Sequence, residues 1–192
     1  MTRTLSLLFV LTFSSSLHAQ QHIYRVNWKG DSIGYLIAEQ KRQGSLTTYE
    51  LKSHTRFSMM VSFDMLTEYY SVFKDGQLLS ATSENTMNDK RRSYSTVKLL
   101  EDRYQVSVDE EERIEHKEIP ESIATLYFFP PKNGQIFSER HGTFCQIRQK
   151  APNHFTLIKP DDRENHYYYR NGVCTRVEVH LPLATIELDK IN

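Results

Sequence analysis

Histidine is the residue type most often used both as a metal ligand and as a general base, so its positions come first. Seven histidines follow Gln20, and no two of them are two or four residues apart, the spacings that place side chains on one face of a strand or helix. The sequence therefore predicts scattered surface histidines and no metal centre. They are His22, His54, His116, His141, His154, His166 and His180.

One short run, Glu139-Arg140-His141, combines an acid, a cation and a base. If the run is part of a strand, only Glu139 and His141 share a face and can act together. No G-x-S-x-G motif supplies a nucleophile, so a hydrolase would need a site that is assembled only by the fold. The acidic run 109–112 lacks the glycine and alternating oxygen ligands of a calcium loop, and we expect a solvated turn there.

The two cysteines, Cys145 and Cys174, form a candidate disulfide. Cys145 alternates in phase with Ile147, whereas Cys174 is in phase with Arg176 and Glu178 and is expected to point away from the core. Their strands would not be neighbours in a simple meander. The pattern therefore favours two thiols over a bond, and neither flanking sequence supplies an obvious histidine partner to activate a thiol.

A methionine-rich run is the most suggestive candidate for binding. Thioether side chains adapt to irregular apolar ligands, and a small barrel could use them as a wall together with apolar residues near 120–129. The alternative is that both segments are ordinary core. The candidate ligand-binding residues are Met59, Met60, Phe63, Met65, Leu126, Phe128 and Phe129.

Apolar and polar residues alternate with period two along most of the chain, which indicates strands that are buried on one face. In the clearest example, Tyr49, Leu51 and Phe57 lie on one face, and the charged residues between them lie on the other. Asp75-Gly76 and Asn171-Gly172 are typical two-residue hairpin turns. The sequence predicts an all-β antiparallel meander that forms a barrel or a strongly curved sheet.

The alternation breaks once, between Ile119 and Pro131. Pro120 suits the first position of a helix, the apolar residues that follow have helical spacing, and Pro130-Pro131 cannot continue a helix. We expect one short helix or packed loop near 120–129, which plugs or caps the sheet.

The first 19 residues have the pattern of a secretory signal peptide, with Arg3, a short apolar run and a small residue, Ala19, at the cleavage point. We expect cleavage after Ala19 and an exported, periplasmic or extracellular product with residues 20–192 as a single domain. The mature chain has no second apolar stretch of membrane-spanning length. A balance of 24 basic and 24 acidic residues gives no field that would attract nucleic acid.

Several motifs together resemble one family of exported proteins of Bacteroidota-type bacteria that carry a domain of unknown function. The strand–glycine start is also similar, more loosely, to other periplasmic β-barrel domains and to the open barrels of lipoprotein carriers. These motifs are mostly turn and strand-pairing residues, so the resemblance implies a fold and no catalytic residues. The motifs are residues 24–30 with Ile33-Gly34, then 70–78, 126–128, 137–142 and 167–172.

Three functions remain open. The first is a non-enzymatic envelope module that binds a hydrophobic ligand such as a lipid or lipidated peptide, and it predicts a cavity between the sheet and the 119–131 segment. The second is a structural or assembly protein that acts through contacts with an envelope protein. The third is the hydrolase described above. We favour the first hypothesis, the non-enzymatic binding module, and expect no cofactor.

Overall fold

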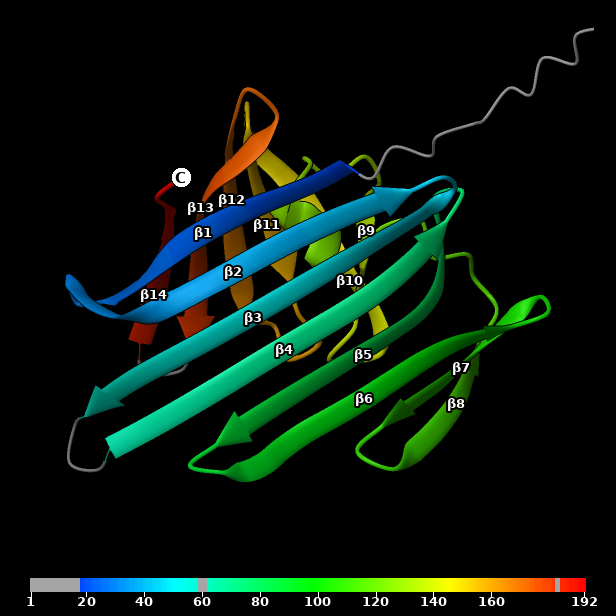
Figure 1. The fold of residues 1–192 in the computed structure, drawn as a ribbon, viewed down its shortest axis with the longest axis horizontal. Helices are drawn as coiled ribbons and strands as arrows, with labels where there is room; N and C mark the ends of the chain where they lie inside the picture. Colours follow the sequence, from blue (N-terminus) through cyan, green and yellow to red (C-terminus); the bar gives the residue numbers. More distant parts are fainter. Residues whose placement is uncertain (1–17, 59–61, 182–183) are drawn as a thin grey trace, which may run out of the picture.

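The computed structural model describes residues 18–58, 62–181 and 184–192, which form one antiparallel sheet of 14 strands (Figure 1). Neighbouring strands follow the chain from β8 back to β1 and then from β14 back to β9. The first and last strands therefore pair in the middle of the sheet, with Val26 opposite Leu188. The predicted all-β meander is confirmed as a strongly curved sheet that is not closed by strand pairing.

The elements of the described residues include one short 3-10 helix, η1. The strands are β1 His18–Trp28, β2 Asp31–Gln43, β3 Leu46–Ser58, β4 Ser62–Lys74, β5 Gln77–Met87, β6 Lys90–Leu100, β7 Arg103–Val108, β8 Glu111–Glu115, β9 Gln135–Ser138, β10 Thr143–Ala151, β11 His154–Ile158, β12 Glu164–Arg170, β13 Val173–Leu181 and β14 Ala184–Lys190, and η1 is Ile123–Tyr127.

Apolar and polar side chains alternate along the strands, so one face of the sheet is buried and the other is exposed. On β3, Tyr49 and Leu51 are buried, whereas Lys52 and Arg56, which follow them in the opposite phase, are exposed. The two predicted hairpin turns are present, and Asp75, Gly76, Asn171 and Gly172 all have the positive φ that such turns require.

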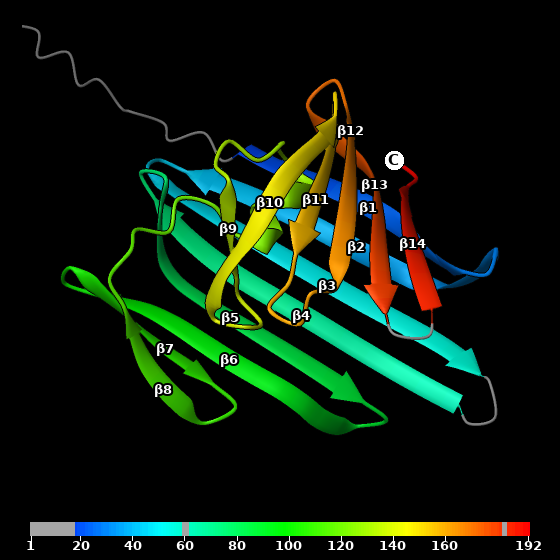
Figure 2. The same ribbon diagram turned by 180° about the vertical axis from the view of Figure 1, so that it is seen from behind.

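The sheet bends over its own inner face. Figures 1 and 2 show the long strands β2–β6 as one wall and the shorter strands β9–β14 as the other, with η1 between the two walls. Because the inner faces of both walls are apolar, folding them toward each other buries side chains from strands that are far apart in the sequence.

The two edges of the sheet meet through turns and side chains. The Arg113 guanidinium of β8 donates to the Gly142 carbonyl oxygen, in the turn between β9 and β10. A Cβ at Gly142 would lie 2.5 Å from a Val106 methyl carbon, so only glycine lets this turn pack so closely on β7. On the free side of β9, the Phe137 amide donates to the Glu121 carbonyl oxygen at 3.1 Å, which covers that edge.

The predicted cleavage point, after Ala19, lies within the N-terminal end of β1. His18 and Ala19 pair with Arg42 and Lys41 of β2. Cleavage after Ala19 would remove only these two paired residues, and the mature chain would begin at Gln20 within the strand. Residues 1–17 of the predicted signal peptide lie outside the described residues.

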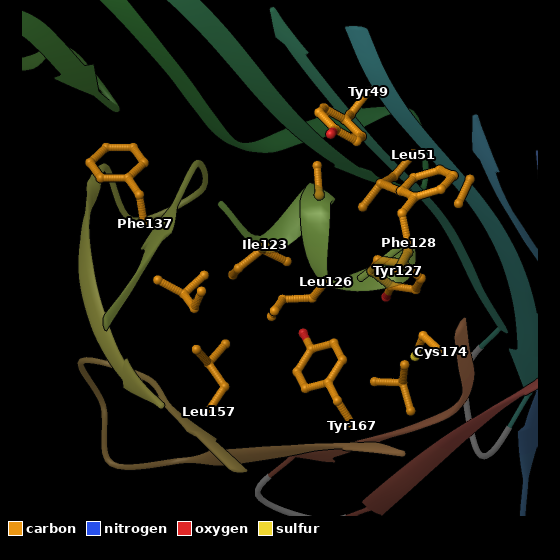
Figure 3. Close-up of a cluster of buried hydrophobic side chains, with 14 of the residues drawn as sticks. Tyr49, Leu51, Ile123, Leu126, Tyr127, Phe128, Phe137, Leu157, Tyr167 and Cys174 are labelled. Atoms are coloured by element: carbon orange, nitrogen blue, oxygen red, sulfur yellow. The ribbon is translucent and has the colours of Figure 1, made fainter. Parts of the chain in front are cut away.

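The segment 119–131, which we call the plug, fills the space inside the curved sheet. The expected short helix is present as η1, and all five of its residues are buried. Figure 3 shows Leu126 and Tyr127 of the plug among Leu51, Leu157 and Tyr167 of both walls. The plug is therefore part of the hydrophobic core.

A fully buried carboxylate, that of Glu139, holds the start of η1. It accepts hydrogen bonds from the Ile123 amide at 3.1 Å, the Ala124 amide at 3.2 Å and the Ser71 hydroxyl of β4 at 3.0 Å. The first amides of a helix have no partner within the helix, so this carboxylate satisfies two groups that would otherwise be buried without one. Burial raises the pKa of Glu139, although the bonds it accepts oppose that effect.

Sheet side chains also hold the other end of η1. The Tyr169 hydroxyl donates to the Leu126 carbonyl oxygen at 2.8 Å, and the Tyr24 hydroxyl, which lies 2.8 Å from the Cys174 carbonyl oxygen, is 3.2 Å from that of Tyr127. His22 Nδ1 lies 3.1 Å from the same Tyr127 oxygen. A helix of only five residues is therefore fixed at both ends by the strands around it.

The position of Glu139 corrects the expectation that 139–141 continues a strand. Residues 139–142 form the turn between β9 and β10, so strand alternation does not apply to them. Glu139 points to the plug, and its backbone oxygen accepts from the Ser95 hydroxyl at 2.5 Å.

Replacing Glu139 tests this arrangement. In Glu139→Gln one acceptor oxygen becomes an NH₂ group, which cannot accept from the amides of η1, so the free energy of unfolding should fall by about 1–3 kcal/mol. Chemical denaturation of both proteins measures the change. The exposed control Glu118→Gln should stay within about 0.5 kcal/mol of the unchanged protein. Equal stability of all three proteins would contradict the proposed role of the carboxylate.

Candidate functional site

Five apolar side chains on the inner face of the sheet form a separate cluster, which we call the apolar patch. They are Trp28 of β1, Phe57 of β3, Phe63 and Met65 of β4, and Met87 of β5. Register places Phe57 opposite Phe63 and Met65 opposite Met87. All five are partly exposed, and none belongs to the main core or packs on it.

The aromatic rings of the apolar patch touch one another. The Phe57 and Phe63 rings stack with centroids 5.0 Å apart, and the Trp28 and Phe57 rings are 5.5 Å apart. β2 lies between the strands of Trp28 and Phe57, and its Gly34 pairs with Val26 of β1 and Thr55 of β3, two residues along each strand from the two rings. A Cβ at Gly34 would lie 2.0 Å from the His54 carbonyl oxygen, so the sheet admits no side chain at this point.

Polar groups border the apolar patch at Trp28. The Lys29 ammonium lies 4.8 Å from the Trp28 ring centroid, which places a cation beside the apolar surface. The Trp28 indole N–H is buried and has no acceptor among the described residues. A ligand with an apolar chain and an anionic end would match the apolar surface and the Lys29 cation.

The structure divides the ligand-binding residues expected from the sequence. Phe63 and Met65 lie in the apolar patch, whereas Leu126 and Phe128 are buried in the core. Phe129 is 44% exposed, and its ring centroid is 6.4 Å from that of Phe128. Met59 and Met60 lie outside the described residues. Sequence reasoning missed Trp28, Phe57 and Met87, although all three are in phase with inward-facing neighbours.

Two hollows on the described part of the chain lie away from the plug and from the apolar patch. One, of about 390 Å³, is lined mainly by hydroxyl and other polar side chains of β5–β8, including Thr82, Thr96 and Lys98. The other, of about 490 Å³, lies near Arg170 and Asn192. Neither is the cavity that a ligand held between the sheet and the plug would need.

The acid and base of the hydrolase hypothesis point to different partners. Glu139 is hydrogen-bonded to η1 and Ser71, whereas His141 Nδ1 lies 2.8 Å from the Ser138 hydroxyl oxygen. Burial lowers the pKa of His141 and raises that of Glu139. Ser138 is itself fully buried, so its hydroxyl is not placed to attack a substrate from solvent.

Both cysteines are buried free thiols, and the expected direction of Cys174 is wrong. Register shifts between Tyr168 and Tyr169, where Tyr168 pairs with Arg176 but Tyr169 pairs with Cys174. This bulge puts Cys174 on the same inner face as Val177. The strands of the two cysteines, β10 and β13, are separated by β11 and β12, as expected for a meander.

Within the described ranges, no set of three or more His, Cys, Asp or Glu side chains is placed to hold a metal ion together. Over the same ranges, no helix has the length and apolar character needed to cross a membrane.

The thiols provide a test of the buried arrangement. Burial raises the pKa of Cys145 to about 11 and that of Cys174 to about 12, so at pH 7.5 both remain protonated and unreactive. A chromogenic disulfide reagent should label neither thiol in the folded protein within minutes, and it should label both after denaturation without reductant. Fast labelling of the folded protein, or no thiols after denaturation, would contradict this arrangement.

Comparison with known proteins gives a fold relative and a family. A crystal structure titled "Beta-barrel-like Protein of Domain of Unknown Function DUF1849 from Brucella abortus" matches with a TM-score of 0.61 and 11% identity, covering 93% of this chain and 98% of that chain. At this identity the match supports the β-barrel-like fold alone. A search of curated proteins finds no match.

A family model described as "Domain of unknown function (DUF6134)" matches residues 24–190. The match runs from the second half of β1 to the last residue of β14, so it includes both walls and the plug. It confirms the coarser expectation of a domain of unknown function, and the chain belongs to the DUF6134 family.

Proposed function

We propose that the protein is an exported, non-enzymatic module of the cell envelope that binds a hydrophobic ligand, a lipid or lipidated peptide, on the apolar patch. The observation that carries this proposal is a cluster of aromatic and thioether side chains that is partly exposed although it lies on the inner face of the sheet. Contiguous exposed apolar surface commonly marks an interaction site.

We place the ligand outside the interior because the interior is filled. The plug occupies the space between the walls, and the two ends of η1 are hydrogen-bonded to Glu139 of the β9–β10 turn and to Tyr169 of β12. The apolar patch lies on the same inner face but outside that core. This location replaces the cavity beside the plug that the sequence suggested.

The chemistry of the apolar patch favours an acyl chain. Transfer of a methylene group from water to an apolar surface is favourable by about 0.8 kcal/mol, so several methylenes are needed to offset the entropy lost on binding. Two methionine side chains can adapt to a flexible chain, and the rings of Trp28, Phe57 and Phe63 provide flat contact area. The Lys29 ammonium beside Trp28 would interact with a carboxylate or phosphate end of the ligand.

Trp28 is the only tryptophan of the chain, so its fluorescence reports on the apolar patch. A fatty acid with a nitroxide near the end of its chain should quench this emission saturably, and unlabelled palmitate should reverse the quenching. Phe63→Ser should weaken binding about tenfold or more, because it removes a side chain worth about 1.5–3 kcal/mol when buried.

Leu66→Ser is the matched control, since Leu66 lies on β4 but on the outer face. It should bind as the unchanged protein does. The proposal fails if the fatty acid does not quench Trp28, or if Phe63→Ser and Leu66→Ser affect quenching equally.

Export and cleavage after Ala19 can be tested separately from ligand binding. The full-length chain, including residues 1–19, is expressed in a bacterium that has a periplasm. The protein should be recovered from the periplasm, and its intact mass should show Gln20 as the first residue. The observed pairing of Gln20 with Gln40 is compatible with a chain that starts there. Retention in the cytoplasm at full length would contradict export without bearing on ligand binding.

A further inference from the structure

Three of the scattered histidines become neighbours on the outer face of the sheet. His154 lies on β11, His166 on β12 and His180 on β13. Thr156 pairs with His166, whereas the alternating residues Leu157 and Tyr167 point into the core. The His154 and His166 ring centroids are 5.3 Å apart, and those of His166 and His180 are 4.8 Å apart.

Two of the imidazoles direct nitrogen atoms at each other. His154 Nε2 lies 3.1 Å from His166 Nδ1, and the Thr156 hydroxyl oxygen lies 3.0 Å from the same His166 nitrogen. Two nitrogens bound to one metal ion at about 2.0–2.1 Å are about 2.9 Å apart at right angles and about 3.3 Å apart in a tetrahedron. The observed separation falls between these values, so the two nitrogens are spaced for one ion, which they would bind once the rings turn to direct both lone pairs at a point beside the line that joins them.

Neighbouring side chains hold the rings in this arrangement. Glu164 Oε2 lies 3.5 Å from His166 Nε2, where the carboxylate favours a proton on that nitrogen and leaves a lone pair on Nδ1. The Tyr168 ring stacks on His154 with centroids 4.4 Å apart and an interplanar angle of 14°. A carboxylate on the far nitrogen of an imidazole is a support typical of histidine ligands, and the stacked Tyr168 ring restricts the orientation of His154.

We propose that His154 Nε2 and His166 Nδ1 bind one divalent transition-metal ion, such as Ni²⁺, Cu²⁺ or Zn²⁺, on the outer face of β11 and β12. The protein supplies two ligands, in agreement with the absence of a three-residue group in the described ranges, and water completes the coordination. His166 is partly shielded, with 15% of its side chain exposed, whereas Glu164 is more open. This site is independent of the proposed lipid site, which lies on the inner face.

Binding can be measured by isothermal titration of the untagged mature protein with Ni²⁺, Cu²⁺ or Zn²⁺ in a buffer that does not chelate metals. One ion should bind per chain, and His154→Gln and His166→Gln should each weaken binding at least tenfold. His116→Gln, which changes an exposed histidine outside the cluster, should leave the affinity unchanged. Circular dichroism checks that each variant is folded, and His154→Gln decides the result if His166→Gln does not fold.

Electron paramagnetic resonance of the Cu²⁺ complex gives a second readout, since nitrogen hyperfine coupling reports bound imidazoles. The spectrum should show two nitrogens in the unchanged protein and one in His154→Gln. No binding by any of the three ions, or equal binding by the unchanged protein and both variants, would overturn the proposal. In either case the contact between His154 and His166 would be an ordinary hydrogen bond between two side chains on the outer face of the sheet.

Discussion

The buried carboxylate of Glu139 is the interaction on which the arrangement of the interior depends. It joins the first amides of η1 to Ser71 of β4, and it lies in the turn that connects β9 and β10. Because an unpartnered buried amide is costly, this contact fixes the plug relative to both walls. Tyr24 and Tyr169 complete the arrangement at the other end of the helix.

A filled interior has a direct consequence for function. The side chains of Leu126 and Phe128 are buried in the core, where they stabilise the fold, so they cannot contact a ligand unless the core opens. The residues of the apolar patch around Trp28 and Phe63 lie on the same inner face and are partly exposed. The same sheet thus has a solid core and, beside it, the apolar patch in which Trp28 and Phe57 are in contact.

Period-two alternation and hairpin turns made the fold class predictable, because most strands of this meander have one buried face and Asp75-Gly76 and Asn171-Gly172 favour tight turns. The direction of Cys174 was not predictable, since a bulge changes the phase of a strand without a pattern that marks it. The role of Glu139 and the meeting of His154 with His166 depend on partners that only register brings together. Phe63 and Met65 were found because their run is rich in methionine, but the sequence could not separate them from Leu126 and Phe128.

Methyl NMR of methionine and leucine side chains, recorded with a nitroxide-labelled acyl chain, tests the central claim most directly. It observes the apolar patch and the plug in one experiment. The account predicts that the Met65 and Met87 methyl signals broaden as the acyl chain binds, whereas the Leu126 signals do not. Broadening of Leu126, or of no methyl group at all, would contradict a solid core with a ligand-binding patch beside it.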